Sequence, residues 1–269
     1  MAATIVIRGG GDLASGVALR LQRAGLHIVI IELPQPLAVR RTVSFAEAIY
    51  EGRITIEDVT AQLASPDQYQ VVLEKGEIPI IVDPDANILK NPLLISPKST
   101  IVVDGRMLKH TSEPLSITPL LYIGLGPGFI AGNDCDVVIE TQRGHTLGRV
   151  IWEGATLADS SKPEGDPRRV LRAPITGVLK SKAKIGDHFE LGQAIAAIDD
   201  EIVAAPFAGI LRGLLHPGLN ATKGLKIGDL DARDDPYLCE LVSDKALAIG
   251  GAVLEVLLTR SKIRDQLWE

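Results

Sequence analysis

The stretch "TIVIRGGGDLASGVALRL" occupies residues 4–21 and decides the expected fold. An apolar, β-branched run from Thr4 to Arg8 predicts a buried strand, and the amphipathic pattern from Leu13 to Ala24, ended by Gly25, predicts a helix. Three glycines stand between the two. A strand, a glycine turn and a helix in this order are typical of α/β folds that hold phosphate groups at the helix N-terminus.

The glycine turn matches the G-x-G-x-x-[GA] pattern through Gly9, Gly11 and Ala14. In this pattern the first glycine permits the tight bend, the second lets the backbone approach a pyrophosphate, and the small third residue allows close packing of helix and strand. Glu32 ends the next apolar run, 21 residues after Gly11, where a carboxylate can bond ribose hydroxyls. The candidate nucleotide-binding residues around this turn are Gly9, Gly10, Gly11, Asp12, Ala14, Glu32, Arg40 and Arg41.

Two features of this region leave alternatives open. Asp12 places a carboxylate beside the expected phosphate, which disfavours an anion there. Arg40 and Arg41 either meet a 2′-phosphate or another anionic group, or they form a solvated basic pair on a loop. The turn can also be present without any nucleotide, because a fold does not imply a function.

Further strand and helix patterns extend this α/β region to residue 118. Apolar runs over His27–Glu32, Ile78–Val82 and Ile101–Asp104 predict strands, and Ser44 is placed to cap a short helix through Tyr50, ended by Gly52. Short strands joined by helical crossovers predict a parallel sheet covered on both faces.

A second glycine-rich segment, Tyr122 to Gly154, predicts strand, glycine loop, strand, turn and strand. Its loop glycines are a poorer dinucleotide motif, because Pro127 lies among them and no helix pattern follows, but they can still form a nest of backbone donors for an anion. Cys135 and His145 follow this loop, and a thiolate and an imidazole there suggest catalysis by sulfur transfer or metal ligation. The alternative is a buried, inert cysteine and a turn histidine. The candidate loop residues are Gly124, Gly126 and Gly128.

An internal repeat follows. The segment "APITGVLKSKAKIGDHFELG" begins at Ala173 and "APFAGILRGLLHPGLNATKG" begins at Ala205, a shift of 32 residues with six of twenty positions identical. Two such halves resemble the pseudo-two-fold barrel-sandwich of biotinyl and lipoyl carrier domains. The hairpin between the halves, "AIDDEIVAAP", lacks the lysine that those domains modify. A structural or docking barrel is therefore expected instead of a carrier.

The C-terminal segment "VSDKALAIGGAVLEVLLTR" predicts a helix capped by Ser243 or Asp244. Gly250 and Gly251 disfavour a helix unless they allow close packing against another backbone, such as that of a partner subunit. The expected domains are a Rossmann-like nucleotide-binding domain (1–118), a glycine-loop and β connector (119–160), a β barrel built from the repeat (161–235) and the C-terminal helix (236–269).

Composition limits the function classes. The 269 residues carry 28 basic and 34 acidic side chains, a net charge of −6, and no basic stripe that would favour nucleic-acid binding. Two cysteines, Cys135 and Cys239, suit a reducing cytoplasm. No apolar window reaches the length of a membrane span, no signal-peptide pattern is evident, and no motif predicts a metal site.

Several blocks together resemble one family. They include "VIRGGGDLASGVALRL", "AVRRTVSFAEAIYEG", "GLGPGFIAGNDCDVVIETQRGHTLGRVIW", "RVLRAPITGVL", "KIGDLDAR" and "SDKALAIGGAVLEVLL". In block order and over nearly the whole chain they are similar to the YqeB-type accessory proteins of selenium-dependent molybdenum hydroxylase systems. The resemblance implies a role in maturing or supplying such an enzyme, as XdhC-type proteins do in handling sulfurated molybdenum cofactor.

Three functions follow from these patterns. The first is an accessory protein that binds a nucleotide-like ligand, such as the dinucleotide form of molybdenum cofactor, and assists a molybdenum hydroxylase apoenzyme. The second is an NAD(P)-dependent oxidoreductase that uses the same turn. The third is a non-catalytic scaffold whose Rossmann-like domain is empty and whose barrel and C-terminal helix dock partners.

Overall fold

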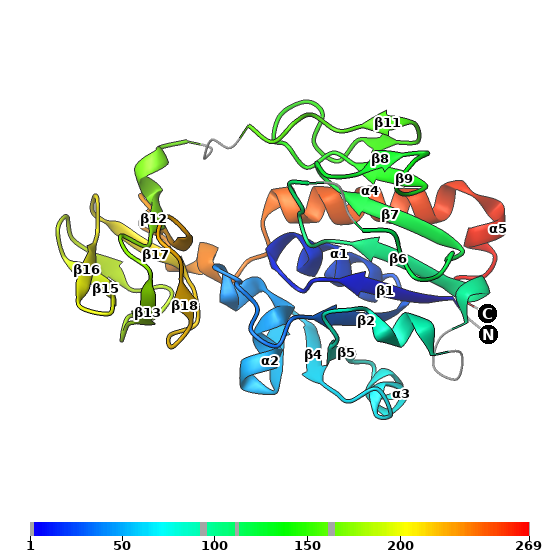
Figure 1. Ribbon diagram of the computed structural model, residues 1–269, viewed down its shortest axis with the longest axis horizontal. Helices are drawn as coiled ribbons and strands as arrows, with labels where there is room; N and C mark the ends of the chain where they lie inside the picture. The colour runs from blue at the N-terminus through cyan, green and yellow to red at the C-terminus, as the bar shows by residue number, and fades with distance from the viewer. Residues whose placement is uncertain (1–2, 92–95, 111–112, 161–164, 269) are drawn as a thin grey trace. The chain divides into compact units, whose positions relative to one another are not determined.

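The computed structural model describes residues 3–91, 96–110, 113–160 and 165–268, and the chain divides into two compact units (Figure 1). The larger unit comprises Met1–Pro36, Phe45–Asp159 and Val242–Glu269, and the smaller comprises Leu37–Ser44 and Ser160–Leu241. The chain therefore enters the smaller unit twice and returns to the larger one each time.

A nine-stranded sheet forms the centre of the larger unit, in the order β10-β9-β7-β6-β1-β2-β5-β4-β3. The seven strands from β9 to β4 are parallel, and antiparallel β10 and β3 lie at the edges. The strands are β1 (Thr4–Arg8), β2 (His27–Glu32), β3 (Arg53–Ile56), β4 (Val59–Leu63), β5 (Ile78–Val82), β6 (Thr100–Asp104), β7 (Leu121–Leu125), β9 (Val137–Ile139) and β10 (Val150–Ile151).

The direction of chain progress reverses between β1 and β6. From β1 the chain adds β2 and β5 on one side of the sheet, and then returns to add β6, β7 and β9 on the other. In open parallel sheets ligands bind outside the carboxyl ends of the strands at such a switch point. The glycine turn after β1 lies at this point.

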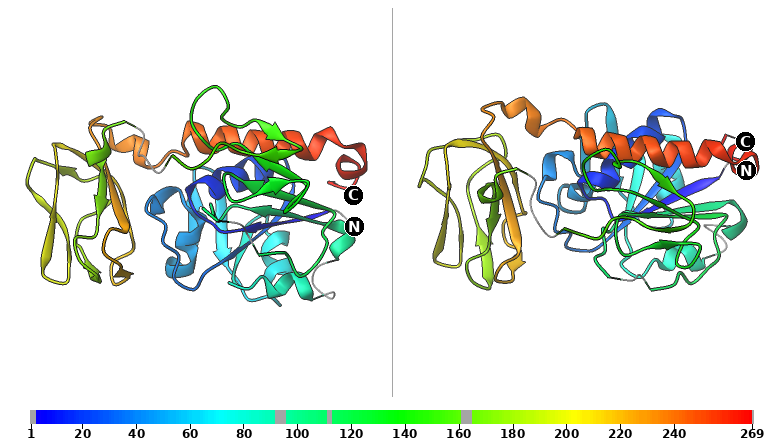
Figure 2. Two further views of the ribbon diagram at one scale, coloured as in Figure 1. Left: turned by 45° about the horizontal axis from the view of Figure 1, so that its top comes forward. Right: turned by 90° about the horizontal axis from the view of Figure 1, so that it is seen from above.

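Helices α1 (Asp12–Arg23) and α4 (Asp244–Thr259) pack against each other, as the views in Figure 2 show. A Cβ on Gly16 would lie 2.6 Å from that of Ala246, and a Cβ on Gly250 would lie 2.6 Å from the Gly16 carbonyl oxygen. Gly250 thus allows close approach of two backbones, as expected, but the neighbour is the chain's own α1 and not a partner subunit. Gly251 has no described atom within 4 Å of a Cβ position.

A second buried layer includes Val6, Val29 and Val102, which pair across the sheet in register and therefore share one of its faces. Tyr69 of α3 (Tyr69–Glu74) and Phe129 belong to the same cluster. Short elements complete the unit: α2 (Ala48–Glu51), α5 (Ser261–Arg264), and the two-stranded sheet of β8 (Ile130–Ala131) and β11 (Gly154–Ala155).

The smaller unit contains two four-stranded antiparallel sheets, β12-β19-β17-β14 and β16-β15-β13-β18. The strands are β12 (Val170–Arg172), β13 (Gly177–Lys180), β14 (His188–Phe189), β15 (Ala194–Ile198), β16 (Glu201–Ala204), β17 (Gly209–Leu214), β18 (Asn220–Ala221) and β19 (Lys226–Asp231). When 32 is added to the residue numbers, β13 corresponds to the start of β17, and β14 corresponds to β18. The same shift relates β12 to β16 and β15 to β19, so the two sheets have one strand order.

The two units differ from the four domains expected from the sequence. Residues 119–159 join the larger unit because β7, β9 and β10 extend its sheet, and Val242–Glu269 joins it because α4 packs on α1. Residues 37–44 belong to the smaller unit. Ser44 does not cap the helix expected after it: its hydroxyl donates to the Arg40 carbonyl oxygen at 2.8 Å.

Within the part of the chain that the structure describes, no helix combines the length and hydropathy required to span a bilayer.

Candidate functional site

The glycine turn after β1 is held by backbone contacts. Gly9 has a φ of +89°, which favours glycine, and its amide donates to the Ile31 carbonyl oxygen at 2.8 Å. The Gly10 amide donates to Glu32 Oε2 at 2.6 Å. Helix α1 then begins at Asp12, with Gly11 at the N-cap and no side-chain capping bond. The turn therefore directs the positive end of α1 toward the switch point.

Gly11 is the open position of the turn. Apart from Gly11 and its two neighbours in the chain, no described residue has an atom within 4 Å of the place a Cβ on Gly11 would take, and its φ of −70° is one that any residue adopts. The fold alone therefore does not require glycine there. By contrast, a Cβ on Gly105 after β6 would lie 2.8 Å from that of Ala14, so the third position of the motif must be small. This contact agrees with the packing role that the motif predicts for Ala14, and the role of Gly11 stays a prediction.

The carboxylate of Glu32 lies beneath the turn at the end of β2. Its two oxygens accept from the amides of Gly10 and Leu33, at 2.6 and 2.7 Å. Burial raises the pKa of this carboxyl, and the two backbone hydrogen bonds oppose that shift. Because each carboxylate oxygen has further acceptor capacity, ribose hydroxyls can still donate to Glu32.

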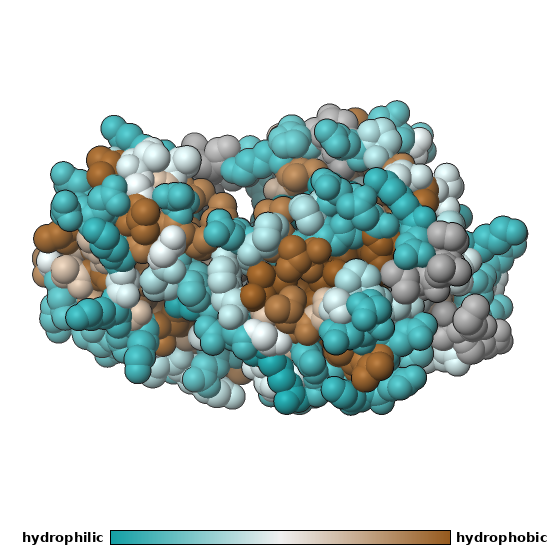
Figure 3. Space-filling view, turned by 60° about the horizontal axis from the view of Figure 1, so that its bottom comes forward, coloured by the Kyte–Doolittle hydropathy of each residue, from teal (hydrophilic) through white to brown (hydrophobic). Residues whose placement is uncertain are grey.

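Apolar side chains are exposed next to this carboxylate. Leu33 follows β2 and is 47% exposed, and Val82, which pairs with Glu32 in the sheet, is 43% exposed. Figure 3 shows apolar surface among polar residues on the larger unit. An exposed apolar residue on each of two neighbouring strand ends provides a surface on which a flat ring can pack.

A charged cluster that the sequence analysis missed lies at the same strand ends. Arg8 and Asp104 pair in register at the carboxyl ends of β1 and β6, and Arg8 Nη1 donates to Asp104 Oδ2 at 3.1 Å. Arg106 Nη2 and the Tyr122 hydroxyl donate to the same oxygen at 2.7 and 3.1 Å. Asp104 is fully buried. Two arginines therefore share one buried carboxylate, and the charge of Glu113 also acts on Arg106.

Arg106 connects this cluster to the glycine turn. The Cα of Arg106 lies 3.5 Å from a Cβ position on Gly9, and its side chain is 31% exposed. Burial opposes its charge, but the hydrogen bonds and Coulomb attraction of Asp104 prevail and raise the pKa of Arg106. The separation of Arg8, Asp104 and Arg106 in sequence explains why no local motif revealed them. The one signal in the sequence was position: Arg8 and Asp104 end predicted strands and Arg106 follows one, where ligand-binding residues of parallel sheets lie.

The chain itself covers the middle glycine. A Cβ on Gly10 would lie 2.9 Å from the Ala46 amide nitrogen, and that amide donates to the Gly10 carbonyl oxygen at 2.8 Å. Ser15 Oγ also donates to Gly10 O, at 3.0 Å, and accepts from the Phe45 amide at 2.8 Å. Gly10 is therefore required by packing, whereas Gly11 is not.

Arg40 and Arg41 belong to the smaller unit and not to the unit that holds the turn. Arg40 Nη2 donates to the carbonyl oxygens of Leu238 and Leu241, and Arg41 Nε donates to that of Leu214 at 2.7 Å. Arg40 is 6% exposed. These contacts hold the Leu37–Ser44 segment within the smaller unit.

The second glycine loop is filled by protein atoms. A Cβ on Gly124 would lie 2.5 Å from Phe129 Cγ, and one on Gly126 would lie 2.6 Å from Thr141 Oγ1. At Gly128 it would lie 2.7 Å from the Leu108 carbonyl oxygen. Packing of the loop against its own unit therefore accounts for all three glycines.

Cys135 and His145 have different environments. Cys135 is 8% exposed, its thiol donates weakly to the Val137 carbonyl oxygen at 3.4 Å, and burial raises its pKa to about 11. The thiol is thus protonated at neutral pH, which disfavours nucleophilic attack. His145 is exposed in the turn between β9 and β10.

The fold and the site define a class: a two-unit α/β protein with a glycine turn and a charged cluster at the switch point of a parallel sheet. The chain is 44% identical over 259 residues to the uncharacterized protein YqeB of Escherichia coli strain K12, which covers 94% of this chain. The match spans 47% of the length of YqeB. This similarity supports the expected relationship to YqeB-type proteins.

No family model matches the chain. An aspartoacylase family protein from Mesorhizobium loti, of known structure, aligns with 85% of this chain and 84% of its own at 7% identity and a TM-score of 0.26. A likeness of this size carries no argument about fold or function.

Proposed function

We propose that the larger unit binds a ligand with a nucleotide-like pyrophosphate at the N-terminus of α1. The observation that carries this proposal is Gly11, a glycine that packing does not require, at an uncapped helix N-terminus on the switch point of the sheet. A side chain at Gly11 would occupy the space that a phosphate needs.

The neighbouring residues suit such a ligand. The amides at the start of α1 would hold the pyrophosphate, and the Glu32 oxygens would accept from ribose hydroxyls. The exposed side chains of Leu33 and Val82 offer a surface for the base. Arg106 lies next to Gly9 and carries a charge that complements a second anionic group. In this proposal Arg106 takes the role that the sequence analysis gave to Arg40 and Arg41.

The proposal includes a finer description of the fold. We interpret the larger unit as Rossmann-like, because its parallel strands other than β4, which are β5-β2-β1-β6-β7-β9, run in the order 3-2-1-4-5-6 of dinucleotide-binding sheets. We interpret the smaller unit as a barrel-sandwich of the biotinyl and lipoyl type, because its two sheets are related by the internal repeat.

We further propose that the protein assists a molybdenum hydroxylase, with the dinucleotide form of molybdenum cofactor as the ligand. The support is the resemblance of the sequence blocks to YqeB-type accessory proteins, together with a site suited to an anionic nucleotide. NAD or NADP would fit the same arrangement of residues, so an oxidoreductase is the alternative to be tested.

The test measures binding of NAD, NADP, ADP, inorganic pyrophosphate and isolated molybdenum cofactor by calorimetry, with wild type and Gly11→Glu. The variant should bind pyrophosphate-bearing ligands at least ~10-fold more weakly, because its carboxylate occupies and repels the phosphate position. Gly251→Glu is the matched control, since Gly251 is also open and exposed but lies in the middle of α4. Its affinity should equal that of wild type.

The other outcomes separate the alternatives. Binding of only NAD or NADP, with hydride transfer to a substrate, would establish the oxidoreductase. Failure of wild type to bind any of these compounds would favour the scaffold. Equal affinity of wild type and Gly11→Glu would contradict the placement of the ligand at the turn.

A further inference from the structure

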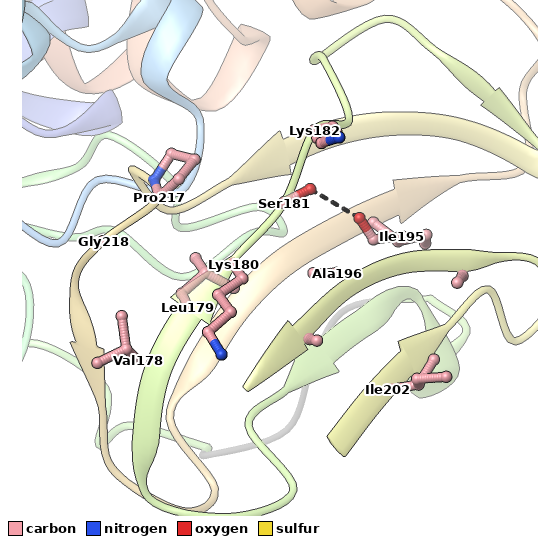
Figure 4. Close-up of a pocket in the computed structure, with 12 residues that line it drawn as sticks. Val178, Leu179, Lys180, Ser181, Lys182, Ile195, Ala196, Ile202, Pro217 and Gly218 are labelled. Atoms are coloured by element: carbon pink, nitrogen blue, oxygen red, sulfur yellow. Dashed lines mark hydrogen bonds between the residues drawn. The ribbon is translucent and has the colours of Figure 1, made fainter. Parts of the chain in front are cut away.

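The smaller unit contains a groove that the proposed function does not use. Its volume is about 580 Å³. Lys180, Ser181 and Lys182 line it from the end of β13, and Ile195, Ala196 and Ile202 line it from β15 and β16 (Figure 4). Ile202 is 66% exposed, so the groove presents apolar surface between two lysines and the neighbouring strands.

The groove lies where the backbone pairing between β13 and β15 ends. These strands pair at Leu179 with Ile198 and at Lys180 with Ala197, and then Ser181 Oγ donates to the Ile195 carbonyl oxygen at 2.7 Å. In the second copy of the repeat, β17 continues to pair with β19 through Leu214, which corresponds to Lys182. The ladder of the first copy thus ends two residues earlier than that of the second, which continues past a register shift between Leu211 and Gly213.

The corresponding surface of the second copy is covered by the chain itself. Gly213 corresponds to Ser181, and a Cβ on Gly213 would lie 2.8 Å from Val39 Cγ1. Gly186 corresponds to Gly218, and a Cβ on Gly186 would lie 3.9 Å from Pro236 Cβ.

Two short peptide segments make this cover: Leu37–Ser44, and the turn Pro236–Cys239. In the first copy, by contrast, no described atom lies within 4 Å of a Cβ position on Gly218.

Hydrogen bonds fix the covering segments to β17. Arg41 Nε donates to the Leu214 carbonyl oxygen at 2.7 Å, and the Cys239 thiol donates weakly to that of Leu211 at 3.8 Å. Leu211 and Leu214 are fully buried. The second copy therefore shows, within this molecule, how a peptide segment with a β-branched residue seats on this surface.

The two copies differ in the charge that they expose. At the position of Lys182 the second copy has the buried Leu214, and at that of Lys180 it has Arg212, whose side chain is 15% exposed. Lys180 and Lys182 are exposed, and Lys180 Nζ lies 3.8 Å from the fully exposed Asp200. The exposed Lys180 and Lys182 therefore favour an occupant of the groove that carries acidic residues.

We propose that the groove beside β13 binds a short acidic peptide segment of a partner protein, seated as Leu37–Ser44 seats on β17. A small β-branched residue of the partner lies over Ser181 and Ala196, in the position that Val39 takes over Gly213. Acidic residues on its C-terminal side pair with Lys180 and Lys182.

The test uses the fluorescein-labelled peptide LAVEETVS, which is the sequence of residues 37–44 with glutamate in place of both arginines. Fluorescence anisotropy with the full chain should show saturable binding, with a dissociation constant below about 1 mM. The double variant Lys180→Glu with Lys182→Glu should bind at least ~10-fold more weakly, and the affinity of wild type should fall with added salt. Lys223→Glu is the control, because Lys223 is an exposed lysine of the same unit outside the groove.

Equal binding of the unaltered peptide LAVRRTVS would contradict the acidic preference. No saturable binding of LAVEETVS to wild type would overturn the proposal, as would equal affinities for wild type and the double variant. Binding of vesicles of anionic phospholipid that Lys180→Glu with Lys182→Glu abolishes, without peptide binding, would assign the groove to a membrane surface and also overturn it. Circular dichroism of each variant confirms that the fold is retained.

Discussion

The two glycine-rich loops of the larger unit look alike in sequence and differ in what surrounds them. In the second, which begins in β7, side chains or carbonyl groups of the same unit occupy the space beside Gly124, Gly126 and Gly128. In the turn after β1, Gly10 is covered in the same way but Gly11 is open. A glycine that its own fold does not need, at a helix N-terminus, is the stronger indication of a ligand.

The largest effect expected from this comparison concerns Cys135. Since its pKa is about 11, its thiolate fraction at neutral pH should be roughly 100-fold below that of an ordinary thiol. Iodoacetamide labelling of the native protein, followed by peptide mass spectrometry, should show correspondingly slow alkylation that accelerates up to about pH 11. The unfolded protein supplies the reference rate. Alkylation of native Cys135 at that reference rate would restore it as a reactive group of the second loop.

A second large effect is expected at Gly124. The Cβ of Gly124→Ala would lie 2.5 Å from Phe129 Cγ, and Phe129 is 1% exposed, so the core must shift to accept it. Overpacking of this kind should lower the free energy of unfolding by about 2 kcal/mol, measured by urea denaturation. Gly11→Ala should change it by less than about 0.5 kcal/mol. Equal stabilities of the two variants would remove the contrast between the loops.

A smaller effect is expected at Glu32, beneath the first turn. Its pKa is raised in the folded chain, so the folded state holds this proton more tightly than the unfolded state does. The resulting stability is present below the ordinary pKa of glutamate and is lost as pH rises through the raised pKa. Glu32→Gln should remove this decline from the pH profile of thermal unfolding. Identical profiles for both proteins would show that the Glu32 carboxyl is not perturbed.

The smallest effect is expected at Asp12, the first residue of α1. Its carboxylate competes with a ligand anion for the positive end of the helix. Asp12→Asn should therefore strengthen the binding of inorganic pyrophosphate about threefold, measured by calorimetry at low ionic strength. Weaker binding by the variant would indicate that Asp12 helps to hold the ligand instead.

Features that depend on neighbouring residues were predictable from the sequence. The helix expected over Leu13–Ala24 is α1 at Asp12–Arg23, and the strand expected over Ile78–Val82 is β5. Both predictions rest on apolar periodicity and on glycine or proline at the ends of the element. These signals depend only on residues close together in the sequence. The internal repeat was also visible, because its turn residues recur at a fixed spacing.

Features that depend on distant contacts were not predictable. The cluster of Arg8, Asp104 and Arg106 forms only when β1 and β6 become neighbours, and no local pattern specifies that pairing. Strands β3 and β4 were also missed, because both strands are short and part of their residues is exposed, which leaves little apolar pattern in the sequence. Arg40 and Arg41 were assigned to the glycine turn on their position after β2, whereas the chain leaves the larger unit at that point.

The contact between Gly16 and Gly250 has a consequence for the synthesis of the protein. The first helix of the larger unit acquires this neighbour only after α4 has been synthesised, and α4 follows the smaller unit in the chain. Until then the surface around Gly16 is exposed, while residues 165–241 of the smaller unit have already been made. The smaller unit can therefore begin folding first, and the larger unit depends on α4 for completion.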